Sequence, residues 1–131
     1  MVAARHAEAR GEPDPPGRLR RAAHWTRRQF ELGADVVLVH QEAARADARV
    51  AVGWRAALEG REAAIRALLQ PLAADLAIPV GEAVDLYVAL TVAEVYRTLV
   101  LERGWEPDRT EAGLGELLCT KLLNAVCRRD V

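Results

Sequence analysis

The amino-acid sequence predicts an all-α fold of five helices, and three observations support this prediction. Apolar residues recur at helical spacing through most of the chain. The apolar run over residues 36–39 could form a short strand, but no second run is present with which it could pair. Residues that favour helix starts or turns divide the chain at Pro16, Asp47, Gly81 and Pro107.

The composition indicates one domain with a core of its own. The chain has 131 residues, of which 51% are hydrophobic, and its formal net charge is -1. This size and apolar content allow a real core, and a net charge near zero gives no general indication of a nucleic-acid or membrane partner. Residues 1–14 contain Pro and Gly without apolar periodicity. We therefore expect a flexible tail over residues 1–14 and a single domain over residues 15–131.

The sequence predicts a soluble, cytoplasmic protein with no membrane contact. Asp85, Glu94 and Arg97 interrupt the longest apolar stretch, which stays below the roughly 20 uncharged residues needed to cross a bilayer. The N-terminus lacks the apolar core of an export signal. Cys119 and Cys127 are expected on one helix, about 12 Å apart by helical rise and beyond disulfide reach. We expect both to be reduced thiols.

The first two helices are expected on either side of Gly33. Residues 16–32 form an amphipathic pattern in which apolar residues share one face and arginines lie mostly outside it. Gly33 interrupts this pattern, and Asp35 is suited to cap a second helix. The second helix would carry the apolar run over residues 36–39 together with His40.

The third helix is expected over residues 48–70, starting after Asp47. Its apolar residues fall on one face: Val50, Trp54, Leu58, Ile65, Leu68 and Leu72. Pro71 lacks a backbone donor and therefore ends or kinks this helix. Arg61 falls in the centre of the apolar face, where an unpaired charge is costly.

Arg61 allows two interpretations. Its guanidinium could line a pocket and bind an anionic or carbonyl group of a ligand. It could instead pair with an acid such as Asp85 or Glu94, or extend its charged end to water.

The last two helices are expected over residues 81–103 and 107–126. The first is apolar on nearly every side and would be about 33 Å long, too long for a small domain to cover, so we expect it to meet a second copy of the chain. Gly104 fits the left-handed position that ends a helix, and Pro107 fits the first turn of the next. The final helix has an apolar stripe: Leu114, Leu117, Leu118, Leu122 and Val126.

No pattern typical of catalysis or metal binding occurs in the sequence. The chain contains no Ser, no HExxH, no CxxC pair and no glycine-rich phosphate loop. His6, His24 and His40 fall on different elements, and no ligand spacing suggests a metal site. We therefore expect a protein that is not an enzyme and uses no cofactor or metal.

The run EAVDLYVALTVAEVYRTLVLERGWEPDR, residues 82–109, resembles the C-terminal half of bacterial tetracycline-repressor-like (TetR family) transcription regulators. In that family a similar run joins the last two helices. The stretch over residues 25–68 is similar to the family's ligand-domain helices, so the resemblance covers roughly residues 15–123. It implies an effector-binding domain that dimerises by pairing the last two helices of each subunit into a four-helix bundle, with the ligand among the middle helices.

Carried onto this chain, the resemblance implies two sets of functional residues. The ligand pocket would draw on Phe30, Val37, His40, Trp54, Arg61 and Tyr87. The dimer interface would fall on Val88, Val95, Leu99, Leu114, Leu118 and Leu122. The implied partners are a second copy of the chain and a small effector that is apolar or weakly anionic.

The sequence departs from the family at its N-terminus. The family's helix-turn-helix domain takes about three helices, and only the Pro/Gly-rich start precedes the first ligand-domain helix, so we expect no direct DNA binding by this chain alone. Glu106 stands where the family often has Ser, so the last helix is expected to have a poorer N-cap. Two alternatives are a heterodimerising partner that titrates a full-length regulator, and a small helical carrier or enzyme using Arg61 and His40.

Overall fold

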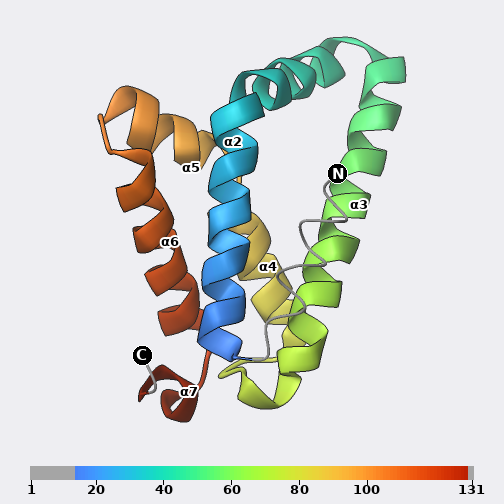
Figure 1. The fold of residues 1–131 in the computed structure, drawn as a ribbon. Coiled ribbons are helices and arrows are strands. Elements are labelled where there is room, and N and C mark those ends of the chain that lie inside the picture. Colours follow the sequence, from blue (N-terminus) through green and yellow to red (C-terminus); the bar gives the residue numbers. More distant parts are fainter. Residues whose placement is uncertain (1–13, 130–131) are drawn as a thin grey trace.

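The computed structural model describes residues 14–129, and this part of the chain is all-helical, as predicted (Figure 1). Within it no strand forms, and Leu76 and Leu123 make only an isolated antiparallel bridge. The predicted tail, apart from Asp14, lies outside the described residues. The elements in chain order are α2 (Pro15–Ala46), α3 (Ala48–Leu69), the 3-10 helix η1 (Gln70–Asp75), α4 (Val80–Leu90), α5 (Ala93–Tyr96), the π-helix η2 (Arg97–Glu102), α6 (Pro107–Leu122) and α7 (Ala125–Arg129).

Helix α2 consists of two helical segments that meet at a kink, in agreement with the two helices predicted on either side of Gly33. The Asp14 carboxylate caps its start by accepting a hydrogen bond from the Gly17 amide at 2.8 Å. Gly33 has non-helical dihedrals, φ -149° and ψ 17°, and the helix then continues to Ala46. The predicted interruption at Gly33 is therefore confirmed, while no capping hydrogen bond from Asp35 is found among the described residues.

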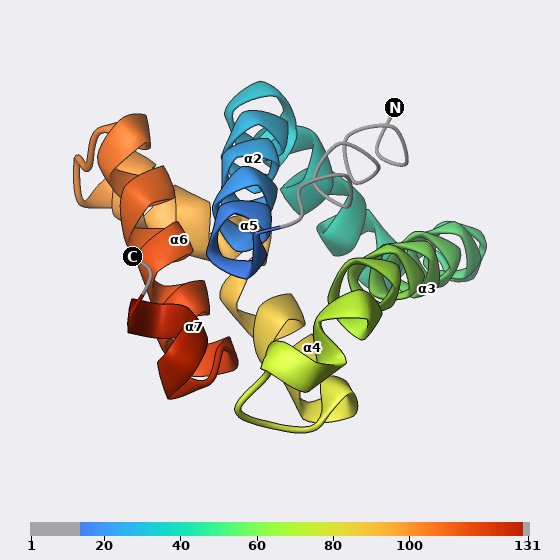
Figure 2. The same ribbon diagram turned by 60° about the horizontal axis from the view of Figure 1, so that its bottom comes forward.

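The main core forms where α2 runs between α6 on one side and α3 on the other, with α4 packed against α3 (Figures 1 and 2). A second, smaller cluster joins Phe30 and Ala34 of α2 to Ala93 and Tyr96 of α5. The buried residues of the main core are Leu19, Ala22, Ala23, Ile65, Leu68, Leu69, Leu72, Leu76, Ala83, Val84, Tyr87, Leu118, Cys119, Leu122 and Leu123.

The long helix predicted over residues 81–103 is broken, so the expected 33 Å element does not form. Helix α4 ends at Leu90, and Val92 has extended dihedrals, φ -77° and ψ 153°. The break lets the two halves bury different sides: Tyr87 enters the main core, and Tyr96 enters the second cluster. The break thereby lets α4 pack against α3 and α5 against α2, while η2 contributes no buried residue.

The turn before α6 agrees with the sequence prediction. Gly104 has φ +72°, the left-handed conformation that favours glycine. Pro107 is the first residue of α6, and Glu106 makes no side-chain capping hydrogen bond. Helix α6 ends at Leu122, so Cys119 and Cys127 lie on separate helices rather than on one, and no disulfide joins them. Burial raises the pKa of the Cys119 thiol.

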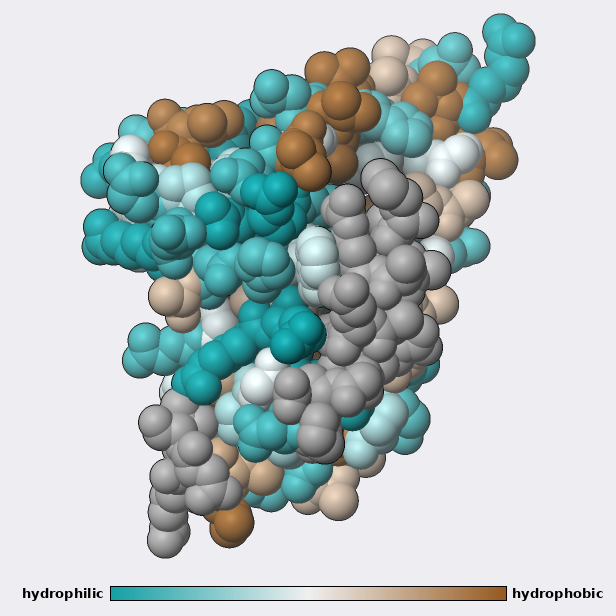
Figure 3. Space-filling view, in the orientation of Figure 1, coloured by the Kyte–Doolittle hydropathy of each residue, from teal (hydrophilic) through white to brown (hydrophobic). Residues whose placement is uncertain are grey.

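The upper end of the molecule in Figure 1 is sparsely packed. No side chain over residues 35–64 is fully buried. The rings of His40 and Trp54 meet edge to face with centroids 5.1 Å apart, and they join the second half of α2 to the first half of α3. Val36 and Val39 are exposed, and Figure 3 shows hydrophobic side chains gathered at this end. Among the described residues, no helix is both long and apolar enough to cross a membrane.

Candidate ligand-binding site

An apolar cavity of about 250 Å³ lies between α2, the segment around the α4–α5 break, and α6. Helix α2 contributes Thr26, Arg27 and Phe30 to its wall. The remaining lining residues come from the break, from α5 and η2, and from α6 with its preceding turn: Leu90, Thr91, Val92, Val95, Tyr96, Leu99, Trp105, Thr110, Glu111, Gly113, Leu114 and Leu117.

Helices α2 and α6 pack closely beside the cavity. The closest approach is at Gly115, where an added Cβ would lie 3.4 Å from the Arg20 side chain. At Gly113, two residues earlier, a Cβ would meet only Trp105, at 3.7 Å. The absence of a side chain at Gly115 therefore allows α6 to pack closely against α2.

Aromatic rings form much of the cavity wall. The rings of Phe30 and Tyr96 lie with centroids 6.2 Å apart and planes inclined at 43°. Trp105, from the turn before α6, also lines the cavity. The guanidinium carbon of Arg109 lies 3.8 Å from the centroid of the Trp105 ring, a cation–π contact.

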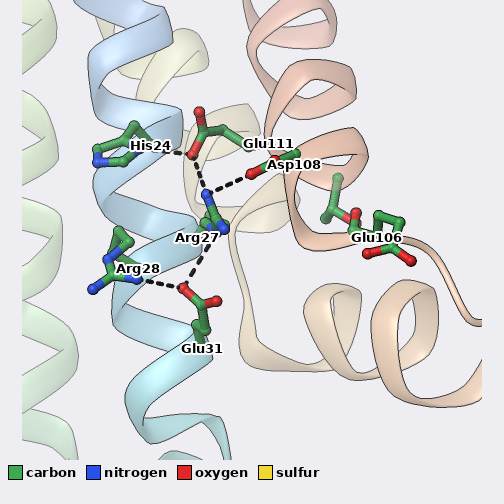
Figure 4. A network of polar contacts seen from close by, with 8 residues as sticks. His24, Arg27, Arg28, Glu31, Glu106, Asp108 and Glu111 are labelled. Carbon is green, nitrogen blue, oxygen red and sulfur yellow. Dashed lines mark hydrogen bonds and ion pairs between the residues drawn. The ribbon is translucent and has the colours of Figure 1, made fainter.

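A group of charged residues borders the cavity and joins α2 to α6 (Figure 4). Arg27 is at its centre: Nη1 lies 3.0 Å from Asp108 and 3.2 Å from Glu111, and Nε lies 3.3 Å from Glu31. His24 Nδ1 lies 2.7 Å from the Glu111 carboxylate. We call this group, together with Arg28, which bonds Glu31 at 2.8 Å, the charged edge.

The charged edge stabilises the positive form of Arg27. Burial lowers the pKa of the Arg27 guanidinium, but the hydrogen bond to Glu111 and the charges of Glu31, Asp108 and Glu111 outweigh that cost, so the pKa is raised. Arg27 and Glu111 both line the cavity, whereas Asp108 is exposed. The cavity therefore has an apolar interior and one ionic border.

The six residues implied as a ligand pocket are not brought together. Only Phe30 lines the cavity. Val37 packs against the second cluster, and His40 and Trp54 contact each other at the upper end. Tyr87 is buried in the main core, and its hydroxyl makes no hydrogen bond of good geometry to the described residues, although it lies beside Thr26. Burial raises the pKa of Tyr87.

Arg61 follows neither of the two interpretations that the sequence left open. Its Nη2 donates to the carbonyl oxygen of Thr91 at 2.6 Å and also contacts the Thr91 hydroxyl. That hydroxyl donates to the Tyr87 carbonyl oxygen at 2.7 Å. Thr91 is the residue at which α4 ends, so Arg61 satisfies the helix C-terminus, where a positive charge is favourable. Burial lowers the pKa of Arg61.

The residues implied as a dimer interface are largely occupied within the chain. Leu118 and Leu122 are 0% exposed within the chain. Neither side chain therefore offers surface to a second copy. Val88 packs against the main core. The other three, Val95, Leu99 and Leu114, line the cavity.

Sequence reasoning missed the residues of the charged edge. The spacing of Arg27 and Glu31 is that of a helical ion pair and was visible in the sequence. The contact between Arg27 and Glu111 joins residues 84 positions apart, and no local pattern indicates it. Among the residues that the structure describes, no cluster of three or more His, Cys, Asp or Glu is arranged to hold a metal ion.

Comparison of the chain with protein-family models, with curated proteins and with solved structures found no match.

Proposed function

We propose that this chain is the effector-binding and dimerisation domain of a transcription regulator of the TetR type, and that the cavity between α2, α5 and α6 holds the effector. The observation that carries the proposal is the cavity, with its apolar wall and single ionic border. Sites for small molecules are concave and mostly apolar, with a few polar groups that set orientation. The resemblance of residues 82–109 to TetR-family regulators is the reason for proposing a role in transcription regulation.

The size of the cavity suits a small effector. An apolar cavity of about 150 Å³ binds benzene. By that comparison, a volume of about 250 Å³ accommodates roughly ten non-hydrogen atoms. The effector would touch α2 through Thr26 and Phe30, so its binding would act directly on the helix that runs through the middle of the fold.

Self-association is the second part of the proposal. Leu101 of η2 is 60% exposed and Leu117 of α6 is 38% exposed. Both lie on the last helical segments, where the resemblance places the dimer contact, and neither is buried by the chain itself. We assign the contact to these two residues, since Leu118 and Leu122 are enclosed in the core. Because Leu117 also lines the cavity, a second copy at this surface would help to close it.

Binding of indole, a small neutral aromatic molecule, tests the cavity. The NMR signal of the Trp105 side-chain N–H reports on the cavity, and that of Trp54, which lies at the upper end, serves as an internal control. Indole is expected to shift the Trp105 signal in a saturable manner and to leave the Trp54 signal unchanged.

A pair of variants locates the binding. Val95→Phe adds a ring at the cavity wall and is expected to abolish the shift of Trp105. Val39→Phe makes the same change at an exposed position and is expected to leave it intact. Absence of any Trp105 shift in the unmodified protein would reject the cavity as a binding site.

A further inference from the structure

The charged edge has more negative than positive groups. Glu31, Asp108 and Glu111 provide three carboxylates, while Arg27 and Arg28 provide two guanidinium groups. Carboxylates therefore outnumber guanidinium groups by one. This excess is unchanged when Arg109, over Trp105, and Glu106, at the start of α6, are added. His24, whose Nδ1 lies 2.7 Å from the Glu111 carboxylate, is left out of this count. Apart from His24, the border of the cavity therefore has one more carboxylate than guanidinium groups.

Among the described residues, Arg27 is the one cation that lines the cavity, and it is already paired. Arg27 is shared among three carboxylates, so a ligand anion would have to displace one of them. Arg61, the residue expected to bind an anionic group, donates to Thr91 and does not line the cavity. The weakly anionic effector expected from the sequence is thus disfavoured.

The cavity offers favourable positions for a positive charge. One oxygen of Glu111, Oε1, is bound to His24 and Arg27, while Oε2 makes no bond within the described residues. Three aromatic rings, those of Phe30, Tyr96 and Trp105, line the cavity. The contact of Arg109 with the Trp105 ring at 3.8 Å shows that this ring already attracts a cation.

We propose that the ligand of this cavity is a hydrophobic cation, that is, an aromatic or aliphatic molecule with one amine or quaternary ammonium group. Its positive end lies against Glu111, and its apolar body fills the space lined by the aromatic and aliphatic side chains. This inference rests on the proposed function, because it names the ligand class of the same cavity.

Three probes that share a phenylpropyl body test the ligand class. 3-Phenylpropylammonium and 3-phenylpropan-1-ol differ only in the ammonium or hydroxyl group, and 3-phenylpropanoate carries the opposite charge. Dissociation constants are measured from the Trp105 signal at low ionic strength. We expect the ammonium probe to bind on the order of tenfold more tightly than the alcohol, and the carboxylate to bind more weakly than both. Added salt is expected to reduce the difference.

A matched pair of variants tests the role of Glu111. Glu111→Gln is expected to weaken the ammonium probe to the affinity of the alcohol without changing the alcohol's affinity, which also confirms that the cavity is intact. Glu116→Gln removes a carboxylate from an exposed position of the same helix outside the cavity and is expected to change neither.

The possible outcomes separate this inference from the proposed function. If the alcohol binds as tightly as the ammonium probe, or the carboxylate binds most tightly, the cation inference is overturned while the cavity stands as a binding site. Equal weakening of all three probes by Glu111→Gln would overturn the assignment of the charge contact to Glu111. If no probe shifts Trp105, the proposed function fails together with the inference.

Discussion

Two arginines on neighbouring helices have opposite surroundings, and these decide their roles. Arg27 meets three carboxylates at the cavity border, and their charges raise its pKa despite burial. Arg61 meets backbone and hydroxyl oxygens only, and burial lowers its pKa. Arg27 therefore contributes to the charge at the cavity border, which a ligand would meet, while Arg61 stabilises the end of α4.

Replacement of Arg61 by Ala is expected to lower the free energy of unfolding by about 1–3 kcal/mol. The change removes a charged donor from the Thr91 carbonyl, and an unsatisfied buried acceptor costs about that much. Urea denaturation measures the loss. Arg55→Ala, at an exposed position of the same helix, is the control and is expected to stay within about 0.5 kcal/mol of the unmodified protein. Equal effects of the two changes would contradict the capping role.

At the scale of the helices, glycine acts differently at three places. Gly33 has non-helical dihedrals and separates the two helical segments of α2. Gly104 adopts φ +72° and ends the π-helical segment, so that the chain can turn into α6. Gly60 lies within α3 and has open space around the position of a Cβ. The same residue type therefore has a conformational role at the turn and lowers helix stability in the middle of α3.

Substitution of Ala at two of these glycines is expected to change stability in opposite directions. Gly104→Ala should destabilise the fold by about 1–2 kcal/mol, because an added Cβ disfavours the left-handed conformation. No atom within 4 Å would obstruct that Cβ, so the cost arises from the backbone alone. Gly60→Ala should stabilise the fold by about 0.4–1 kcal/mol by improving helix propensity. Thermal and urea denaturation of both variants measure the signs, and two changes of the same sign would refute this explanation.

At the scale of the whole molecule, the exposed apolar side chains of the described residues include two surfaces on different helices. One is on η2 and α6 and includes Leu101 and Leu117. The other includes Val36 and Val39 and lies at the upper end, where Figure 3 shows hydrophobic side chains gathered. Exposed apolar surface of this kind often marks an interaction site. The proposed dimer uses the first surface.

Sedimentation velocity of two variants tests which surface is used. We expect the unmodified protein to be dimeric at micromolar concentration, and Leu101→Glu to make it monomeric because it places a charge in the apolar contact. Val39→Glu, at a position 68% exposed, is expected to remain dimeric. If Val39→Glu is monomeric and Leu101→Glu remains dimeric, the dimer contact lies at the upper end instead. If the unmodified protein is monomeric, the proposed dimer is rejected.

The sequence by itself determined the helical class and the features that depend on a few neighbouring residues. The start of α3 after Asp47, the left-handed Gly104, the first turn of α6 at Pro107 and the missing cap at Glu106 were all predictable. Each follows from the backbone preferences and hydrogen-bonding groups of residues close in the chain. Apolar periodicity also indicated correctly that Ile65 and Leu68 belong to the core.

Only the tertiary structure decided where the chain bends, which surfaces it covers and where the cavity lies. Periodicity shows which side of a helix is apolar but does not specify what covers it. For that reason the break at Thr91, which places Tyr87 in the main core and Tyr96 in the second cluster, could not be predicted, and a straight helix was expected instead. The pairing of Arg27 with Glu111 depends on the packing of α6 along α2, and packing between distant segments leaves no local pattern in the sequence.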